Sequence, residues 1–158
     1  RRSLWTVAID GERKPERLLQ ADFSSRHSQL SPDGHWFAYS ATESPVEQVY
    51  VQSFPPGRGK WQISTDGGDQ PRWRRDGREL FYIDPLGKMM SVEIKPGATF
   101  EPGPPKPLFT FRGSNNPWSS FRYDVTADGR KFIILTPVED TSFDPIHIVL
   151  NWTAGLKK

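Results

Sequence analysis

The sequence has no cysteine, which excludes disulfide bonds and thiolate metal sites. It has only three histidines, His27, His35 and His147, and no two of them stand at the short spacing of a metal-binding pair. No apolar run reaches the roughly 18–20 residues that a membrane-spanning helix needs. No stretch keeps a helical hydrophobic period beyond one turn. We therefore expect no membrane insertion by this segment, no disulfide and no helical fold.

A strong excess of charge of one sign is also missing. Lys and Arg number 21 against 19 Asp and Glu, which gives a formal net charge of +2. Arginine occupies positions 72, 74, 75 and 78, close to Trp73. Alternation along a strand would place Trp73 on one face and the arginines at 72 and 74 on the other. We therefore expect no nucleic-acid partner, and we expect Trp73 to pack between neighbouring repeats.

Sequence motifs of common enzymes are absent as well. There is no Gly-x-Ser-x-Gly elbow and no glycine-rich phosphate loop. Asp33, Asp76 and Asp128 suggest a ring of metal ligands at first sight, but aspartate in such turns usually caps its own backbone. We predict that the segment is not itself an enzyme and that it holds no metal and no cofactor.

What the sequence does contain is one turn unit used three times. The fullest copy is Ser-Pro-Asp-Gly at 31–34, and Asp-Gly returns at 76–77 and 128–129. Proline presets φ for a turn, aspartate bonds its own backbone, and glycine accepts a positive φ. The glycines Gly34, Gly77 and Gly129 are 43 and 52 residues apart. A repeat of about 40–45 residues with several strands is typical of propeller blades.

Strands are expected on both sides of these turns. Alternating, β-branched and aromatic segments predict strands at 4–9, 17–20, 36–41, 49–54, 61–64, 80–83, 89–94, 107–110, 131–135 and 146–151. Asp-Gly at 10–11 predicts a hairpin between the first two. The fold class is therefore all-β, with propeller blades of four antiparallel strands each.

Grouping the strands in fours divides the chain into a single partial β-propeller of about three to three and a half blades. The expected parts are a half blade at 1–21, blades at 22–65 and 66–111, and an incomplete blade at 112–158. A closed propeller needs about four to eight blades. We therefore expect a homodimer in which two copies complete a ring of blades.

Two stretches carry a resemblance to a known family. The three Asp-Gly turns and the link at 63–73 resemble TolB-type and WD-repeat-like bacterial β-propellers. The closing stretch at 146–158, with Asn151 and Trp152, resembles the end of propellers that follow serine/threonine kinase domains in some bacteria. The resemblance implies a propeller fold and a periplasmic or otherwise extracytoplasmic location. Such motifs specify a fold and say little about function.

The long link at 111–121 is the first candidate for ligand binding. It is polar, longer than its counterparts, and contains Asn115, Asn116 and Trp118. Aromatic residues beside asparagine and serine are typical of binding loops, and long ordered loops often carry function. The alternative is that Trp118 packs the loop onto the next repeat.

His27, Asp69 and Gln70 are further candidates, because they lie where a link enters the next repeat. His27 would face a ligand, and Asp69 would line a channel. In related propellers the position of Asp69 more often bonds the backbone of a neighbouring blade.

Two functions fit these observations. The first is a non-catalytic binding or scaffold module, which serves as the protein-interaction or sensor portion of a larger protein with a protein or small-ligand partner. The alternative is the propeller portion of a peptidase or glycan-processing enzyme whose catalytic domain lies elsewhere. A downstream Gly-x-Ser-x-Gly domain in the gene would favour the alternative. An upstream kinase domain with a membrane segment would favour the first.

Overall fold

The computed structural model describes residues 2–19, 22–97, 99–112 and 121–136. Every regular element in these residues is a β-strand, and the strands pair antiparallel in several sheets. The expected all-β class is therefore confirmed. No helix that is long and apolar enough to cross a membrane occurs in this part of the chain.

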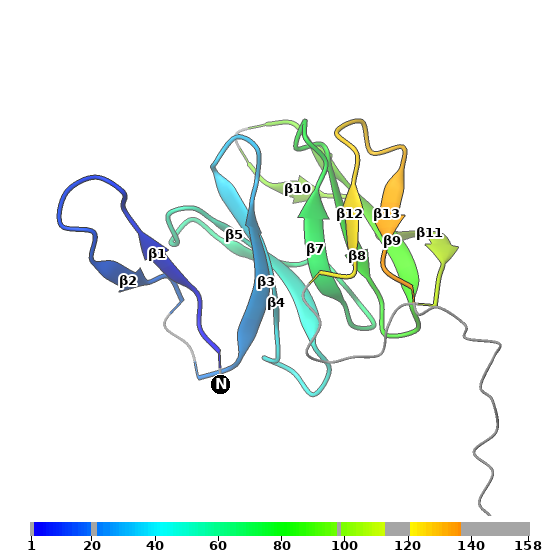
Figure 1. Ribbon diagram of the computed structural model, residues 1–158, viewed down its shortest axis with the longest axis horizontal. Helices are drawn as coiled ribbons and strands as arrows, with labels where there is room; N and C mark the ends of the chain where they lie inside the picture. The colour runs from blue at the N-terminus through cyan, green and yellow to red at the C-terminus, as the bar shows by residue number, and fades with distance from the viewer. Residues whose placement is uncertain (1, 20–21, 98, 113–120, 137–158) are drawn as a thin grey trace, which may run out of the picture.

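Two larger sheets form the body of the molecule (Figure 1). The first sheet has four strands in chain order: β3 (Ser25–Leu30), β4 (Trp36–Ala41), β5 (Gln48–Ser53) and β6 (Lys60–Gln62). The second sheet has β7 (Asp69–Trp73), β8 (Glu79–Ile83) and β9 (Lys88–Lys95) in order. Its outer strand β9 pairs along different parts of its length with β10 (Glu101–Pro102) and β11 (Lys106–Thr110).

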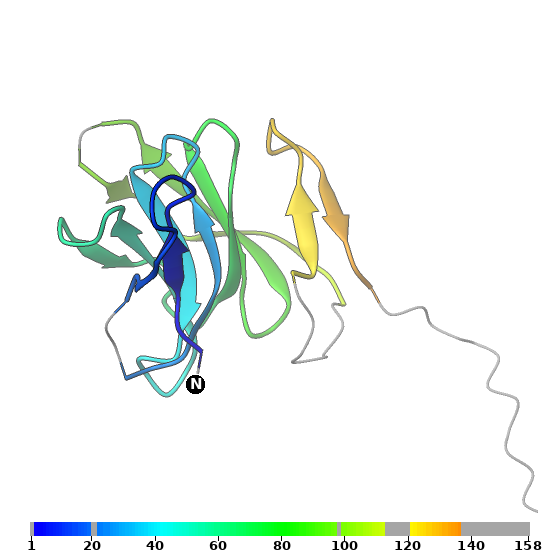
Figure 2. The ribbon, with the colours of Figure 1, turned by 60° about the vertical axis from the view of Figure 1, so that its left-hand side comes forward.

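Two separate hairpins flank these sheets. One hairpin pairs β1 (Trp5–Val7) with β2 (Pro15–Arg17), and the other pairs β12 (Tyr123–Val125) with β13 (Phe132–Ile134). Figure 2 shows the β12–β13 pair as a layer of its own beside the second sheet. Buried Phe81, Ile83 and Met89 of that sheet pack against Tyr123, so the hairpin is attached by an apolar contact.

Most of the expected strands are present, with two differences within the described residues. The return strand of the first hairpin is β2 at Pro15–Arg17 rather than 17–20. The short strand β10 was not expected, because Glu101–Pro102 carries no alternating pattern. The strand expected at 146–151 lies outside the described residues.

The three turns have the geometry that their sequence predicts. Each aspartate accepts a hydrogen bond at 3.0 Å from the backbone N–H two residues ahead, on His35, Arg78 and Arg130 respectively. Each glycine has φ of 73°. These aspartates therefore cap their own turns, as expected.

Replacing the turn glycines by valine is expected to lower the free energy of unfolding by roughly 1–3 kcal/mol for each, because a β-branched residue is strained at positive φ. Gly34 isolates the backbone effect, since a Cβ there would meet nothing within 4 Å. Gly97→Val is the matched control, because Gly97 is exposed and lies outside the positive-φ region. Urea denaturation measures the change. Gly34→Val with the same midpoint as Gly97→Val would contradict the prediction.

The main core lies between the two larger sheets. Residues at or beside the first sheet contribute Ala38, Val49, Val51 and Ile63, and those at or beside the second contribute Trp73, Leu80, Tyr82, Val92, Ile94 and Phe100. The Trp73 side chain is only 4% exposed and contacts this cluster. The expectation that Trp73 packs between neighbouring repeats is therefore confirmed for the two sheets.

The expected propeller is wrong. The described strands form separate sheets, and these sheets do not close into a ring. The reason lies in the motif on which the expectation rested. An Asp-Gly turn is a local device that joins two antiparallel strands, so its recurrence fixes hairpins and leaves the arrangement of successive sheets undetermined. The resemblance to propellers that follow kinase domains rested on 146–158, outside the described residues.

Candidate functional site

The candidate site lies at the end of the sheets opposite to the three Asp-Gly turns. In Figure 1 these turns are at the upper end, and the turns β4–β5 and β8–β9 are at the lower end. The strands β3 and β7 both begin at this lower end. His27 lies in β3, and Asp69 and Gln70 lie in β7, so the fold brings three of the predicted site residues to one place.

A backbone irregularity aims these side chains. The pairing of β3 with β4 shifts register between Arg26 and Gln29, and the pairing of β7 with β8 shifts between Asp69 and Arg72. His27 and Gln70 sit inside these shifts with φ of 49° and 58°. A bulge re-aims the side chains of its strand. Positive φ at a residue other than glycine is costly and persists only where surrounding contacts hold it.

Asp69 is the centre of the contacts between the two sheets. Its Oδ1 accepts hydrogen bonds from His27 Nδ1 at 2.7 Å and from Ser40 Oγ at 2.6 Å. The same oxygen accepts the backbone N–H of Gln70 at 2.7 Å. Since His27 and Ser40 belong to the first sheet and Asp69 to the second, these bonds join the sheets side chain to side chain.

Arg26 extends this network towards the β4–β5 turn. Its guanidinium lies 3.5 Å from Asp69 Oδ2. It also makes a two-pronged hydrogen bond to the Glu47 carboxylate, with Nε donating to Oε1 at 2.8 Å. Paired geometry of this kind is the strong form of an Arg–carboxylate contact. The two carboxylates therefore fix the Arg26 side chain at the edge of the sheet.

The network holds Asp69 in its charged form. Burial alone would raise the pKa of Asp69, but the hydrogen bonds from His27 and Ser40 and the electrostatic interactions with His27 and Arg26 outweigh it. The result lowers the pKa of Asp69 from 3.8 to about 2. A carboxylate with so low a pKa is a weak base at neutral pH, which suits a structural tie.

Acid is expected to weaken this tie. Asp69 has a lower pKa folded than unfolded, so its charge stabilises the folded state above the unfolded value of 3.8 and ceases to do so as the pH falls through about 2. The contribution is about 2 kcal/mol. Urea denaturation of the parent and Asp69→Asn checks this, because the difference in their unfolding free energies should shrink by that amount towards acid. A difference that stays constant with pH would contradict it.

Gln70 connects the second sheet to the β12–β13 hairpin. Its Oε1 accepts the backbone N–H of Arg122 at 2.6 Å, and its backbone carbonyl accepts the Tyr123 hydroxyl at 2.9 Å. Burial raises the pKa of Tyr123 well above its ordinary value, so this hydroxyl keeps its proton. The ring centroid of Phe121 lies 5.1 Å from that of His27 and 3.7 Å from the Arg72 guanidinium. Gln70 thus joins the second sheet to the β12–β13 hairpin by hydrogen bonds.

A pocket of about 660 Å³ opens beside this network. Its wall is made by both larger sheets and by the approach to the β12–β13 hairpin: Val46, Glu47, Gly68, Asp69, Ile83, Asp84, Pro85, Leu86, Gly87, Thr110, Phe111, Arg112 and Arg122. The volume lies within the range of small-ligand pockets. Of the predicted site residues that the structure describes, only Asp69 lines it.

Gly67 and Gly68 let the wall of the pocket form. A Cβ on Gly67, which has φ of 105°, would lie 2.6 Å from Pro85 Cγ and 2.8 Å from Val46 Cγ1. A Cβ on Gly68 would lie 2.8 Å from Tyr82. Two adjacent glycines are therefore needed where the link crosses from one sheet to the next.

The remaining predicted site residues, Asn115, Asn116 and Trp118, lie outside the described residues. Sequence reasoning did not find Ser40 or the pair of Arg26 and Glu47. The sequence could have indicated Ser40, because it is a small polar residue inside the apolar strand β4. In the structure its side chain is fully buried. Arg26 and Glu47 are 21 positions apart, and no sequence spacing links them.

The contacts of Ser40 bear on what chemistry the site can support. An activated serine nucleophile donates its proton to a nearby general base, most often histidine. Here the Ser40 hydroxyl donates to Asp69, and the imidazole of His27 bonds the same carboxylate oxygen. The serine and the histidine therefore share an acceptor instead of forming a relay. Within the described residues, no group of three acidic or histidine side chains is placed to hold a metal ion.

Comparison with known proteins gives one result on the fold. No family model matches the chain, and no curated protein matches it. A protein from Bacteroides uniformis, whose crystal structure carries the provisional name 6-phosphogluconolactonase, superposes with a TM-score of 0.51 at 17% identity. The match covers 84% of this chain and 40% of that one, so the matched part of this chain spans less than half the length of that structure.

This comparison overturns the expected family. The neighbour is named as a lactonase, with no TolB-type or WD-repeat description. Together with the separate, unclosed sheets, this comparison contradicts the expected TolB-like or WD-repeat-like propeller. The chain is an all-β protein of antiparallel sheets that shares its fold with part of this lactonase-named structure.

Proposed function

We propose that the chain is a non-catalytic binding module, which recognises a peptide segment of a partner protein in the 660 Å³ pocket. The observation that carries the proposal is the construction of the pocket wall. Turns from both larger sheets line it, and the contacts of Asp69 and Arg26 join those sheets beside it. A wall held in this way is organised before a ligand arrives, which lowers the entropic cost of binding.

The lining suits a peptide that has both apolar and polar groups. Val46, Leu86 and Phe111 supply apolar surface, and charged side chains of both signs surround it. The acidic groups are already engaged: Glu47 holds Arg26, and Asp84 Oδ1 accepts the backbone N–H groups of Leu86 and Lys88. We therefore expect recognition to rest on the apolar lining, with orientation set by the polar rim.

Peptide selection on the immobilised chain tests this proposal. Peptides from a displayed random library that bind the parent should lose affinity about tenfold or more for Leu86→Asp, because a charge replaces apolar contact surface. Leu86 is 75% exposed, so the variant should fold. Ile9→Asp is the matched control, since Ile9 is 81% exposed on the β1–β2 hairpin, away from the pocket. Peptides that bind all three proteins equally would overturn the proposal.

A second candidate is a non-catalytic portion of a larger enzyme that acts on peptides or glycans. It is favoured by the partial coverage of a neighbour that carries an enzyme name. Under both candidates, the chain alone should not turn over 6-phosphogluconolactone or p-nitrophenyl acetate. Hydrolysis by the purified chain that Ser40→Ala abolishes would contradict both of them.

Self-association is part of the proposal. It is supported by exposed apolar side chains on or beside the β12–β13 hairpin and on β11, with Ile133 at 75%, Leu135 at 56% and Leu108 at 46% exposure. Surfaces of this kind often mark contacts with another chain. Light scattering at micromolar concentration should give the mass of a dimer, and a monodisperse monomer would contradict it.

A further inference from the structure

A second pocket lies near the Asp-Gly turns, at the end of the sheets opposite to the one described above. Its volume is about 340 Å³, and it shares no lining residue with the larger pocket. The β3–β4 turn, the β5–β6 turn and the residues Gly97, Thr99 and Phe100, which lie between β9 and β10, line it. Its volume lies at the small end of the range for ligand pockets, so a single ring with its substituents is the right size of occupant.

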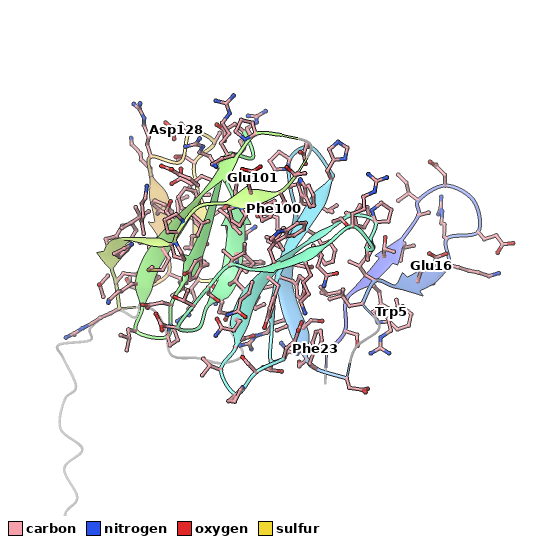
Figure 3. The ribbon with its side chains drawn as sticks, turned by 180° about the vertical axis from the view of Figure 1, so that it is seen from behind. Trp5, Glu16, Phe23, Phe100, Glu101 and Asp128 are labelled. Atoms are coloured by element: carbon pink, nitrogen blue, oxygen red, sulfur yellow. The ribbon has the colours of Figure 1, made fainter. Side chains whose placement is uncertain are left out.

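Three aromatic rings form the floor of this second pocket. The ring centroids of Trp36 and Trp61 are 5.4 Å apart in an edge-to-face arrangement, and Phe100 lies 5.2 Å from Trp36 and 5.0 Å from Trp61. Phe100 is 4% exposed and belongs to the main core, whereas both tryptophans remain partly exposed. Figure 3 shows Phe100 beside Glu101 over the body of the sheets, well apart from Trp5 on the flanking hairpin. The floor is therefore anchored in the core and still offers indole surface.

The rim of the second pocket is polar and is held by backbone contacts. His35 and Arg58 both line it and are exposed. The backbone carbonyl of His35 accepts the N–H of Phe54 at 2.7 Å, and Ser53 Oγ accepts the N–H of Arg58 at 2.9 Å. Two anchored turns therefore bring His35 and Arg58 to the lining of the pocket that the aromatic rings share.

We propose that this pocket binds a pyranose sugar that carries an anionic group. The C–H face of a pyranose is weakly positive and stacks on the negative face of an indole. Arg58 supplies a permanent positive charge with a planar fork of donors, which matches a carboxylate or a phosphate. His35 supplies ring nitrogens for sugar hydroxyls. The charge of Arg58 disfavours a cationic ligand, although the aromatic floor alone would accept one.

Titration calorimetry with three probes tests the proposal: D-glucuronate, glucose 6-phosphate and glucose. We expect the parent chain to bind at least one of the two anionic sugars about tenfold more tightly than glucose, because a hydrogen bond to a charged group is stronger than one to a neutral group. Preference for glucuronate would identify the anionic group as a carboxylate, and preference for glucose 6-phosphate would identify it as a phosphate. No binding of either anionic sugar at millimolar concentration would overturn the proposal, as would glucose binding equally well.

Matched variants separate a binding role from a packing role. Arg58→Ala should remove the preference for the anionic sugar, while Arg13→Ala, an exposed arginine on the β1–β2 hairpin, should leave it unchanged. Trp61→Ala should weaken binding of the anionic sugar about tenfold, and Trp5→Ala should not. Trp61→Phe keeps an aromatic face and should restore part of the affinity if the alanine variant is poorly folded. Unchanged affinity in Arg58→Ala, or equal losses in Trp61→Ala and Trp5→Ala, would overturn the assignment.

Discussion

Asp69→Ala is expected to lower the free energy of unfolding by about 3–5 kcal/mol. The change removes an acceptor shared by His27, Ser40 and the backbone N–H of Gln70. It also removes one of the two carboxylates beside Arg26. Buried donors that lose their acceptor cost their full desolvation energy, and the Asp69 side chain is only 18% exposed.

Chemical denaturation of Asp69→Ala and two companions measures this effect. Asp69→Asn should cost less than the alanine variant, because the amide oxygen still accepts a hydrogen bond. Asp66→Asn is the matched control, because Asp66 is an exposed aspartate nearby whose carboxylate accepts a hydrogen bond from the hydroxyl of the adjacent Thr65. It should change stability by less than about 0.5 kcal/mol. A loss as small for Asp69→Ala as for Asp66→Asn would contradict the role given to Asp69.

Trp73→Ala is the second large effect, with an expected loss of about 3–5 kcal/mol. The indole fills the space between the two larger sheets, and its Nε1 donates to the Gln29 carbonyl at 3.3 Å. The backbone N–H of Trp73 also donates to Gln29 Oε1 at 2.8 Å. Truncation would leave a cavity at the centre of the main core and break one bond between the sheets.

The control for Trp73→Ala is Trp5→Ala, because Trp5 is 58% exposed on the flanking hairpin and Trp73 is 4% exposed. Thermal and urea unfolding of both variants should show a large loss for Trp73 and a change within about 0.5 kcal/mol for Trp5. The loss of stability in Trp73→Phe should lie between the losses in the two alanine variants, since the phenylalanine ring fills part of the space that the indole occupies. Equal, small losses in Trp73→Ala and Trp5→Ala would mean that the sheets do not depend on this contact.

Local features of the fold were predictable from the sequence. The Asp-Gly turns depend on a few adjacent residues, and Asp33 bonds the N–H of His35 as its position predicts. The strand β4 at Trp36–Ala41 matches the predicted range, because aromatic and small apolar residues follow the turn directly. Burial of Trp73 was likewise predictable, since alternation places it opposite Arg72 and Arg74.

The arrangement of the sheets was not predictable in the same way. Whether successive sheets close into a ring depends on their relative rotation, which no turn motif encodes. The propeller was therefore inferred from the repeat period and from the family resemblance, and neither fixes that rotation. The contacts of Asp69 with His27 and Ser40 join positions 42 and 29 residues away. Position in the links indicated His27, Asp69 and Gln70 separately, but nothing in the sequence indicated that His27 and Asp69 bond each other.

The claim at the centre of this account is that Asp69 joins the two larger sheets through His27, beside the larger pocket. A double-mutant cycle on unfolding free energy, with His27→Ala, Asp69→Ala and the double variant, tests it most directly. Residues in direct contact should show a coupling energy of roughly 0.5–3 kcal/mol, so the double variant should lose less than the sum of the single losses. Losses that add within about 0.3–0.5 kcal/mol would show that the two side chains act independently and would contradict the account.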